Sequence, residues 1–238
     1  MDRMHFGQHS SSQFNEALES IRNHLMEMGG LVEKQVVDAL ESLLHADSGL
    51  AEKVMHTEEK VDQLEIQIDE ECARVLALRQ PAASDLRLII AVSKAVSDLE
   101  RIGDESAKIA AMALQLSEQG ESPRGYVEVR HIGNHVRNML RDTLDAFARF
   151  DADKALDVAA EDNEVDLEYR SAMRSLVTFM MEDPRAISRV LNIIWSLRAL
   201  ERIGDHARNI AEQVIYLVKG KDVRHISVDE MQKQVKKD

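Results

Sequence analysis

The sequence predicts an all-α protein built as a tandem repeat of two three-helix bundles. Two compositional observations favour helices: the chain has only three prolines and 4% aromatic residues, and it is rich in good helix formers such as Ala, Leu, Glu and Arg. An internal repeat sets the number of bundles. DALESLLHAD at 38–47 aligns with DTLDAFARFD at 142–151, and LERIGD occurs at both 99–104 and 200–205. The 238 residues suffice to bury a full core.

Each half is expected to contain three long helices. The expected helices cover residues 14–46, 50–79, 83–118, 126–150, 154–182 and 184–219. Asp47-Ser48 supplies a plausible N-cap for the second helix, Asp151 or Asp153 one for the fifth, and Asp183 before Pro184 one for the sixth. The third helix carries apolar residues at alternating spacings of three and four, which is typical of a bundle seam: Leu88, Val92, Ala95, Leu99, Ile102 and Ile109.

The remaining segments divide the chain. We expect a flexible N-terminus at 1–13, bundles at 14–119 and 126–219, a joint (GESPRG) at 120–125 and a C-terminal tail at 220–238. Residues 1–12 and 226–238 lack a sustained apolar stripe, so we expect both to be mobile ends.

The charge and the cysteine count indicate the class of protein and its compartment. A formal charge of −13 argues against binding to nucleic acid or to anionic lipid. The single cysteine, Cys72, cannot form an internal disulfide and is expected to be a small buried hydrophobe. With no secretory signal and no apolar run long enough for a membrane span, a cytoplasmic protein is expected.

The acidity is concentrated in the second helix of each half. Residues 51–71 and 151–170 each hold eight acids and two basic residues. Acids four positions apart, which lie on one helix face, occur on the second and third helices of both halves: Glu58 with Asp62, Glu100 with Asp104, Asp162 with Asp166, and Glu201 with Asp205. Packing the second helix beside the third would gather four carboxylates in each half.

Such carboxylate groups suit a hard cation. Without cysteine or a duplicated histidine, the donors favour Mg²⁺, Mn²⁺, Ca²⁺ or iron over tetrahedral zinc. His206 could be an accessory ligand, but its counterpart in the first half is Glu105. Gly103 and Gly204, each between two acids in mid-helix, indicate a close approach, either of a ligand or of a tightly packed helix.

Several motifs together resemble the PhoU family of phosphate-transport accessory regulators. They are the two LERIGD copies, the paired acids, MEMGGLVE at 26–33, RQPAASDLRLI at 79–89 and YLVKGKDVRH at 216–225. The resemblance covers essentially the whole chain. It implies a cytoplasmic, non-enzymatic homodimer that binds metal ions, in some members iron clusters, through its E/D-xxx-D pairs.

The resemblance also implies a function and partners. Family members are linked with the phosphate ABC transporter and with the sensor histidine kinase of the phosphate two-component system, and they repress the phosphate-starvation response when phosphate is plentiful. The first site would be Glu58, Asp62, Glu100 and Asp104, and the second Asp162, Asp166, Glu201 and Asp205. Our hypothesis is that metal crosslinks the second and third helices and fixes a docking surface.

One difference between the halves bears on metal occupancy. Ser97, one turn before Glu100, is matched by Arg198 before Glu201. A guanidinium there would supply positive charge to the carboxylates directly, so we expect the second site to bind metal more weakly than the first.

Two alternatives remain open. A ferritin-like di-metal carboxylate oxidase would need two Glu-x-x-His motifs, and only Glu128-Val-Arg-His131 supplies one. A metal-free helical scaffold would use its acidic faces for solvation and act through protein contacts. Arg101, Arg202 and Arg208 could meet an acidic partner, although surface pairs four residues apart are the simpler interpretation.

Overall fold

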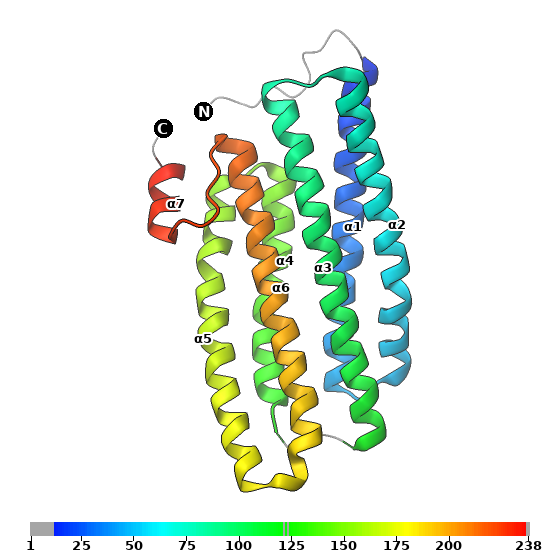
Figure 1. Cartoon of the computed structure of the whole chain (residues 1–238), viewed down its shortest axis with the longest axis vertical. Coiled ribbons are helices and arrows are strands. Elements are labelled where there is room, and N and C mark those ends of the chain that lie inside the picture. Colours follow the sequence, from blue (N-terminus) through cyan, green and yellow to red (C-terminus); the bar gives the residue numbers. More distant parts are fainter. Residues whose placement is uncertain (1–11, 121, 123, 237–238) are drawn as a thin grey trace.

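Seven α-helices and one short 3-10 turn make up the structure, a computed structural model that describes residues 12–120, 122 and 124–236. The first half contains α1 (Ser12–Leu44), α2 (Ser48–Arg79) and α3 (Ala83–Gln119). The second contains α4 (Tyr126–Arg149), α5 (Ala152–Glu182), the turn η1 (Pro184–Ala186) and α6 (Ile187–Lys219), and α7 (Val228–Val235) follows. The predicted all-α repeat of two three-helix bundles is confirmed, and each long helix ends within a few residues of its expected bounds (Figure 1).

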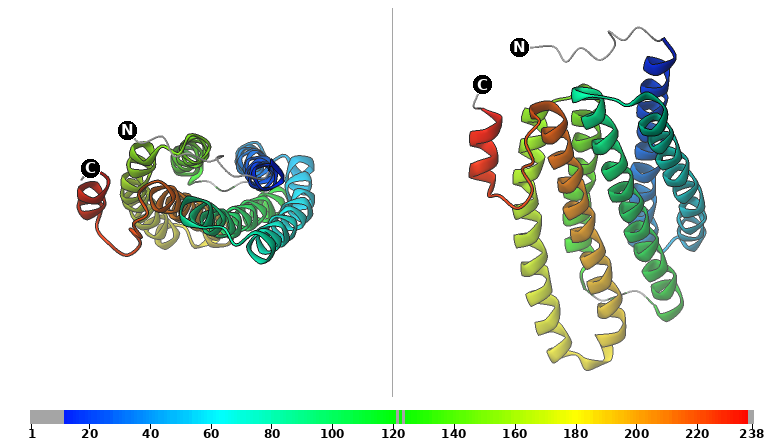
Figure 2. Two further views of the ribbon diagram at one scale, coloured as in Figure 1. Left: turned by 90° about the horizontal axis from the view of Figure 1, so that it is seen from above. Right: turned by 45° about the horizontal axis from the view of Figure 1, so that its top comes forward.

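The two bundles lie side by side and share an extensive contact. Within each half all three helices pack against one another, and between the halves α3 packs on α6 and α1 packs on α4. Seen from above, α1 and α4 lie on one side of the molecule and α3 and α6 run next to each other on the other side (Figure 2). The apolar side chains of both halves form one hydrophobic core cluster.

The contact between α1 and α4 reproduces the sequence repeat. Gly29 of α1 lies against Leu144 of α4, and Gly133 of α4 lies against Leu40 of α1. The two glycines are 104 residues apart, and so are the two leucines. A Cβ at either glycine would collide with a Cδ atom of the facing leucine, so the missing side chains are what allow these helices to approach closely. The halves therefore meet through two reciprocal leucine-on-glycine contacts.

The predicted caps are present. The side chain of Asp47 accepts a hydrogen bond from Leu50 N (2.9 Å), and that of Asp151 accepts one from Lys154 N (3.0 Å). Asp183 accepts from Arg185 N, with Pro184 at the first position of η1. Each aspartate satisfies an amide that the helix itself leaves without an acceptor.

The C-terminal segment corrects our expectation of a mobile end. Residues 228–235 form α7, which packs on α5 and buries Met231 and Val235. Ser227 and Glu230 form a capping box at its start. Most of the N-terminal segment, residues 1–11, and residues 237–238 lie outside the described residues.

Two further expectations concern the membrane and the cysteine. No helix in the described part of the chain is long and apolar enough to cross a bilayer. Cys72 is buried, as expected. Burial, with Asp69 and Glu71 nearby, raises the pKa of its thiol to about 12, so it carries no reactive thiolate at neutral pH.

Candidate metal centre

The first acid cluster forms where α2 packs beside α3. Glu58 and Asp62 come from α2, and Glu100 and Asp104 come from α3. Glu58 lies within hydrogen-bonding reach of Asp104. Burial, the contact with Asp104 and the nearby charges of Asp62 and Glu100 raise the pKa of Glu58 to about 7. The four side chains that we predicted for this site are therefore neighbours in space.

Two more acids of α2, neither of which we predicted as a site residue, extend the first cluster. Glu65 accepts a hydrogen bond from Ser97 Oγ (3.2 Å), and Asp69 accepts one from Ser93 Oγ (2.9 Å). Burial, with Asp69 and Asp62 nearby, raises the pKa of Glu65. The signal was available, because positions 58, 62, 65 and 69 follow the three-and-four spacing of one helix face.

The first cluster contains little compensating positive charge. Arg101 Nε lies 4.0 Å from Glu100 Oε2, and the arginine side chain is largely exposed to solvent. The other contacts that hold these acids come from neutral serines. Burial and the charge of Asp104 raise the pKa of Glu100, which is the expected response to partly desolvated carboxylates that repel one another.

The second acid cluster, between α5 and α6, has the same layout but contains three arginines. Arg208 Nη1 lies 3.0 Å from Asp162 Oδ2, and Arg208 Nε lies 3.2 Å from Glu212 Oε1. Arg198 pairs with Glu201, as the sequence comparison predicted, and stacks over Tyr169. The remaining pair joins Arg170 to Asp166 (3.4 Å).

The three arginines have no equivalents in the first half. Counting along the repeat, Arg198 corresponds to Ser97, Arg208 to Ala107 and Arg170 to Ile66. Tyr169, under Arg198, likewise replaces Glu65. The second cluster is therefore neutralised by its own side chains, whereas the first is not.

Burial dominates the titration of the second cluster. It raises the pKa of Asp162, which the hydrogen bond from Arg208 opposes, and it raises that of Glu201, where Asp205 adds to the effect. Burial also raises the pKa of Asp205, with Asp162 and Asp166 contributing. All four predicted residues of this site are thus within electrostatic reach of one another.

The two mid-helix glycines face side chains of neighbouring helices. A Cβ at Gly103 would lie 3.2 Å from Gln35 Oε1 and 3.5 Å from Val61 Cγ1. At Gly204 it would lie 3.5 Å from Val136 Cγ1 and 3.6 Å from Val165 Cγ1. A Cβ would thus make ordinary van der Waals contacts at Gly204 and would meet only the flexible end of Gln35 closely at Gly103, so packing does not exclude a side chain at either position.

The acids of each cluster lie near one another without converging on one point. In residues 12–120, 122 and 124–236, no group of three or more His, Cys, Asp or Glu side chains is arranged to hold a metal ion. Mutual repulsion favours separated carboxylates, and binding a cation in the first cluster would require them to turn toward one another. Their chemistry nevertheless fits a hard cation, since the cluster consists of carboxylates with little positive charge among them.

His206 and Arg202 bridge the two halves. His206 Nδ1 lies 2.8 Å from Asp98 Oδ1, and Arg202 Nε lies 3.1 Å from Glu105 Oε1. His206 is thus engaged with α3 rather than with the acids of its own half. For Arg202, the simple prediction of a partner four residues away is wrong, because its partner lies on the other bundle.

His131, the histidine of the Glu128-Val-Arg-His131 motif, pairs with an acid of another helix. His131 Nε2 lies 3.1 Å from Glu168 Oε1 of α5, which His135 also approaches at 3.4 Å. This pairing connects α4 to α5 and leaves Glu128 outside it.

Comparison with known proteins gives a consistent result. A family model described as "PhoU domain" matches twice, at residues 25–113 and 129–214. A "Phosphate-specific transport system accessory protein PhoU homolog" of Pseudomonas putida is 67% identical over 227 residues, covering 95% of this chain and 89% of that protein. The Escherichia coli K12 protein named "Phosphate-specific transport system accessory protein PhoU" is 46% identical over 233 residues, covering 98% and 96%.

Solved structures agree with the sequence matches. The crystal structure of PhoU from Pseudomonas aeruginosa has a TM-score of 0.87 and 68% identity, and the match covers 88% of this chain and 100% of that one. The phosphate transport system regulatory protein PhoU from Streptococcus pneumoniae has a TM-score of 0.82 and 32% identity, with 89% and 99% coverage.

Proposed function

Because the chain belongs to the PhoU family, we propose that it is a non-enzymatic regulator of phosphate uptake and of phosphate-starvation signalling. The names of its relatives support a role in the regulation of phosphate transport. More specifically, we propose that the protein is a cytoplasmic homodimer that connects the phosphate ABC transporter with the phosphate sensor histidine kinase. It represses the starvation response when phosphate is plentiful.

We further propose that the first acid cluster holds a hard cation, Mg²⁺, Mn²⁺, Ca²⁺ or an iron ion. Glu58 and Asp62 would bind it from α2, and Glu100 and Asp104 from α3. The observation that carries this proposal is the group of closely spaced acids in which burial, the contact with Asp104 and mutual repulsion raise the pKa of Glu58 to about 7. A bound cation would supply the missing positive charge and crosslink the two helices.

The second cluster would bind a cation more weakly. Asp162, Asp166 and Glu201 each have an arginine partner, and Asp205 alone would retain its full charge for a metal. The proposed docking surface therefore depends mainly on the first half.

A metal-free scaffold is the second candidate function. It is favoured by the lack of a convergent ligand group among the described residues. In that case the acids would serve solvation, and the partners would recognise the helices alone.

Metal analysis and thermal melting separate these two candidates. Protein purified without chelator is analysed for bound metal and melted with and without Mg²⁺ or Mn²⁺. A cation at a hundredfold excess over its Kd stabilises the folded state by about 2.7 kcal/mol, which raises the Tm by roughly 5–10 °C for a chain of this length. Asp104→Asn should abolish the rise and Asp205→Asn should leave most of it.

Partner capture tests the adaptor role itself. Affinity capture at high and at low phosphate should recover the transporter and the kinase with the wild-type chain. Absence of both partners in both states would contradict the adaptor proposal, and no bound metal with no melting shift would favour the scaffold.

A further inference from the structure

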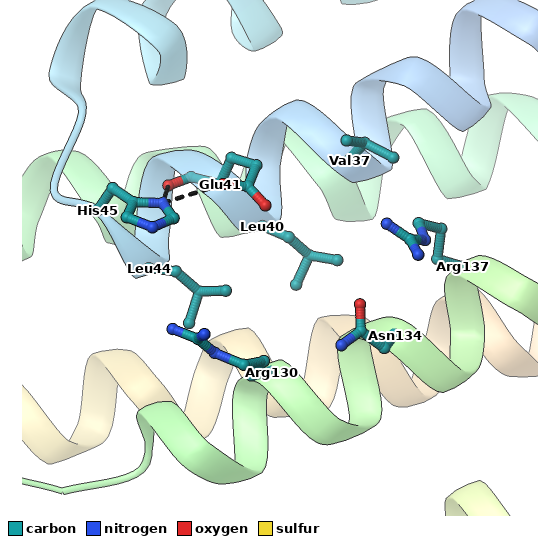
Figure 3. A pocket seen from close by; sticks show the side chains of 8 residues that line it. All are labelled: Val37, Leu40, Glu41, Leu44, His45, Arg130, Asn134 and Arg137. Carbon is teal, nitrogen blue, oxygen red and sulfur yellow. Dashed lines mark hydrogen bonds and ion pairs between the residues drawn. The ribbon is translucent and has the colours of Figure 1, made fainter.

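A small cleft lies between the C-terminal end of α1 and the N-terminal half of α4, and its lining includes no residue of either acid cluster. Its volume is about 140 Å³. Leu40 and Leu44 line it from α1, and Arg130, Asn134 and Arg137 line it from α4 (Figure 3). The three polar side chains of α4 point across the cleft toward α1 (Figure 3).

The two arginines of the cleft lack partners. Within the residues that the structure describes, neither Arg130 nor Arg137 makes a hydrogen bond or an ion pair. Other arginines of the same helix are paired, Arg141 with Asp142 at 3.6 Å and Arg149 with Asp145 at 2.6 Å. Two guanidinium groups left uncompensated in a chain of charge −13 indicate that this cleft favours an anion.

The spacing of the polar side chains allows them to act together. Positions 130, 134 and 137 lie on one face of α4, with the two arginines about 10.5 Å apart along the helix axis. The Arg137 side chain extends toward the middle of the cleft, that of Arg130 extends toward Leu44, and Asn134 lies between the two arginines along α4 (Figure 3). Guanidinium groups bind the oxygen atoms of phosphate and carboxylate with paired N–H donors.

The size of the cleft limits the ligand. Pockets for drug-sized molecules and cofactors occupy about 300–1,000 Å³, more than twice the volume here. A single phosphoryl group would fit, whereas a nucleotide would extend into solvent.

Glu41 is the one acid among the lining residues, and it faces a histidine. His45 Nδ1 lies 3.0 Å from Glu41 Oε2, and both side chains are more than half exposed to solvent. The carboxylate is therefore directed toward His45, so that its repulsion of an anion is reduced by a neighbour that can carry positive charge.

The repeat does not explain the two arginines. In the first half the positions of Arg130, Asn134 and Arg137 are held by Met26, Gly30 and Glu33. The equivalents of the two arginines at the pseudo-symmetric end of the α1–α4 contact are thus not cations.

We propose that this cleft is a binding site for a phosphoryl group, held by Arg130, Arg137 and Asn134. The site is separate from the acid clusters, needs no metal and does not rest on the proposed adaptor role. Two ligands present the required tetrahedral oxyanion with two negative charges: free inorganic phosphate and a phosphorylated side chain.

Calorimetric titration of the full chain tests the proposal. Inorganic phosphate is titrated in the presence of EDTA, so that a metal bridge in the acid cluster cannot contribute. The double variant Arg130→Gln/Arg137→Gln should lose at least tenfold in affinity. Arg141→Gln/Arg149→Gln, which removes the same charge from the same helix, should stay within twofold of the wild type. O-phosphoserine in a parallel titration identifies the source, since tighter binding of the ester would indicate a phosphorylated side chain.

Each outcome decides the question. Failure of both phosphate and phosphoserine to bind the wild-type chain would overturn the proposal. Equal losses in the two double variants would do the same, because they would reveal a non-specific charge effect. Phosphate binding that requires metal and disappears in Asp104→Asn would place the anion site at the acid cluster and overturn the proposal. Circular dichroism of each variant verifies that it folds.

Discussion

The two acid clusters occupy equivalent places in the two halves but differ in how their charge is balanced. In the first, six acids of α2 and α3 meet serines and one exposed arginine. In the second, arginines at 170, 198 and 208 pair with three of the four predicted acids. The repeat has thus kept the four predicted carboxylates and changed their partners. The balance of charge, more than the presence of acids, distinguishes a cation site from a structural network.

The largest effect is expected from removing the arginine that balances two buried acids. Arg208→Leu would leave Asp162 and Glu212, which are 8% and 7% exposed, without their cation. Breaking a buried pair costs about 3–5 kcal/mol, and we expect roughly 2–4 kcal/mol here because Arg208 is partly exposed to solvent. Urea denaturation at pH 7.5 measures the loss.

The matched control lies at the equivalent position of the first half. Ala107→Leu introduces the same side chain where no carboxylate depends on the residue, so it should change stability by less than about 1 kcal/mol. If both variants lose the same stability, the pairing of Arg208 is not what holds the second cluster together.

The pH dependence of the first cluster should give the next largest effect. The folded-state pKa of Glu58 is about 7, above its ordinary value of 4.5. The folded chain therefore holds this proton where the unfolded chain has lost it. Its contribution to stability is fully present below pH 4.5 and is lost as the pH rises through 7. After allowance for solvent screening and coupling, the loss is on the order of 1–3 kcal/mol.

Glu58→Gln tests that dependence. In the presence of EDTA the variant should be more stable than the wild type at pH 8 and nearly equal to it at pH 5, as measured by urea denaturation across this range. Asp162→Asn is the informative counterpart, because the hydrogen bond from Arg208 opposes the rise in the pKa of Asp162, so this variant should gain less stability at pH 8 than Glu58→Gln. An unchanged pH profile in Glu58→Gln would contradict the assigned repulsion.

The sequence predicted the fold and the shared layout of the clusters better than it predicted their contacts. Helical periodicity and caps at Asp47, Asp151 and Asp183 set the helix bounds, because these signals are local. The ion pair of Arg208 with Asp162 depends on how α5 and α6 are rotated against each other. The sequence of neither helix alone determines that rotation. The ion pair of Arg202 with Glu105 of the other bundle likewise depends on how α3 and α6 pack, so it could not be predicted from either helix.

The difference between the halves can be tested by exchanging one residue. Ser97→Arg places in the first cluster the cation that pairs with Glu201 in the second. If the first cluster binds metal, the variant should weaken Mn²⁺ binding at least tenfold, about 1.4 kcal/mol. It should also stabilise the metal-free protein, because the new guanidinium offsets the repulsion. Metal titration with equilibrium dialysis measures the first effect and melting in EDTA the second.

The reverse exchange is the control for that experiment. Arg198→Ser removes the cation from the second cluster and should increase its affinity for Mn²⁺, without affecting the first. Unchanged Mn²⁺ affinity in both variants would show that these positions do not decide metal binding.

The smallest effect is expected at α7, which has no counterpart in the first half among the described residues. α7 packs on α5 with Met231 and Val235 buried, and α2 has no such cover within the described residues. The pattern Ser227-x-x-Glu230 followed by two apolar residues four apart could have predicted this helix, because a capping box marks a helix start.

Ser227→Ala removes the cap of α7 and should cost about 0.5–1 kcal/mol. The loss should be local, with faster amide exchange in residues 228–235 and little change in global Tm. The control is Ser117→Ala, which changes an exposed serine near the end of α3 and should leave amide exchange in α7 unaffected. Slower or unchanged exchange in the Ser227→Ala variant would mean that the buried Met231 and Val235 alone fix α7 on α5.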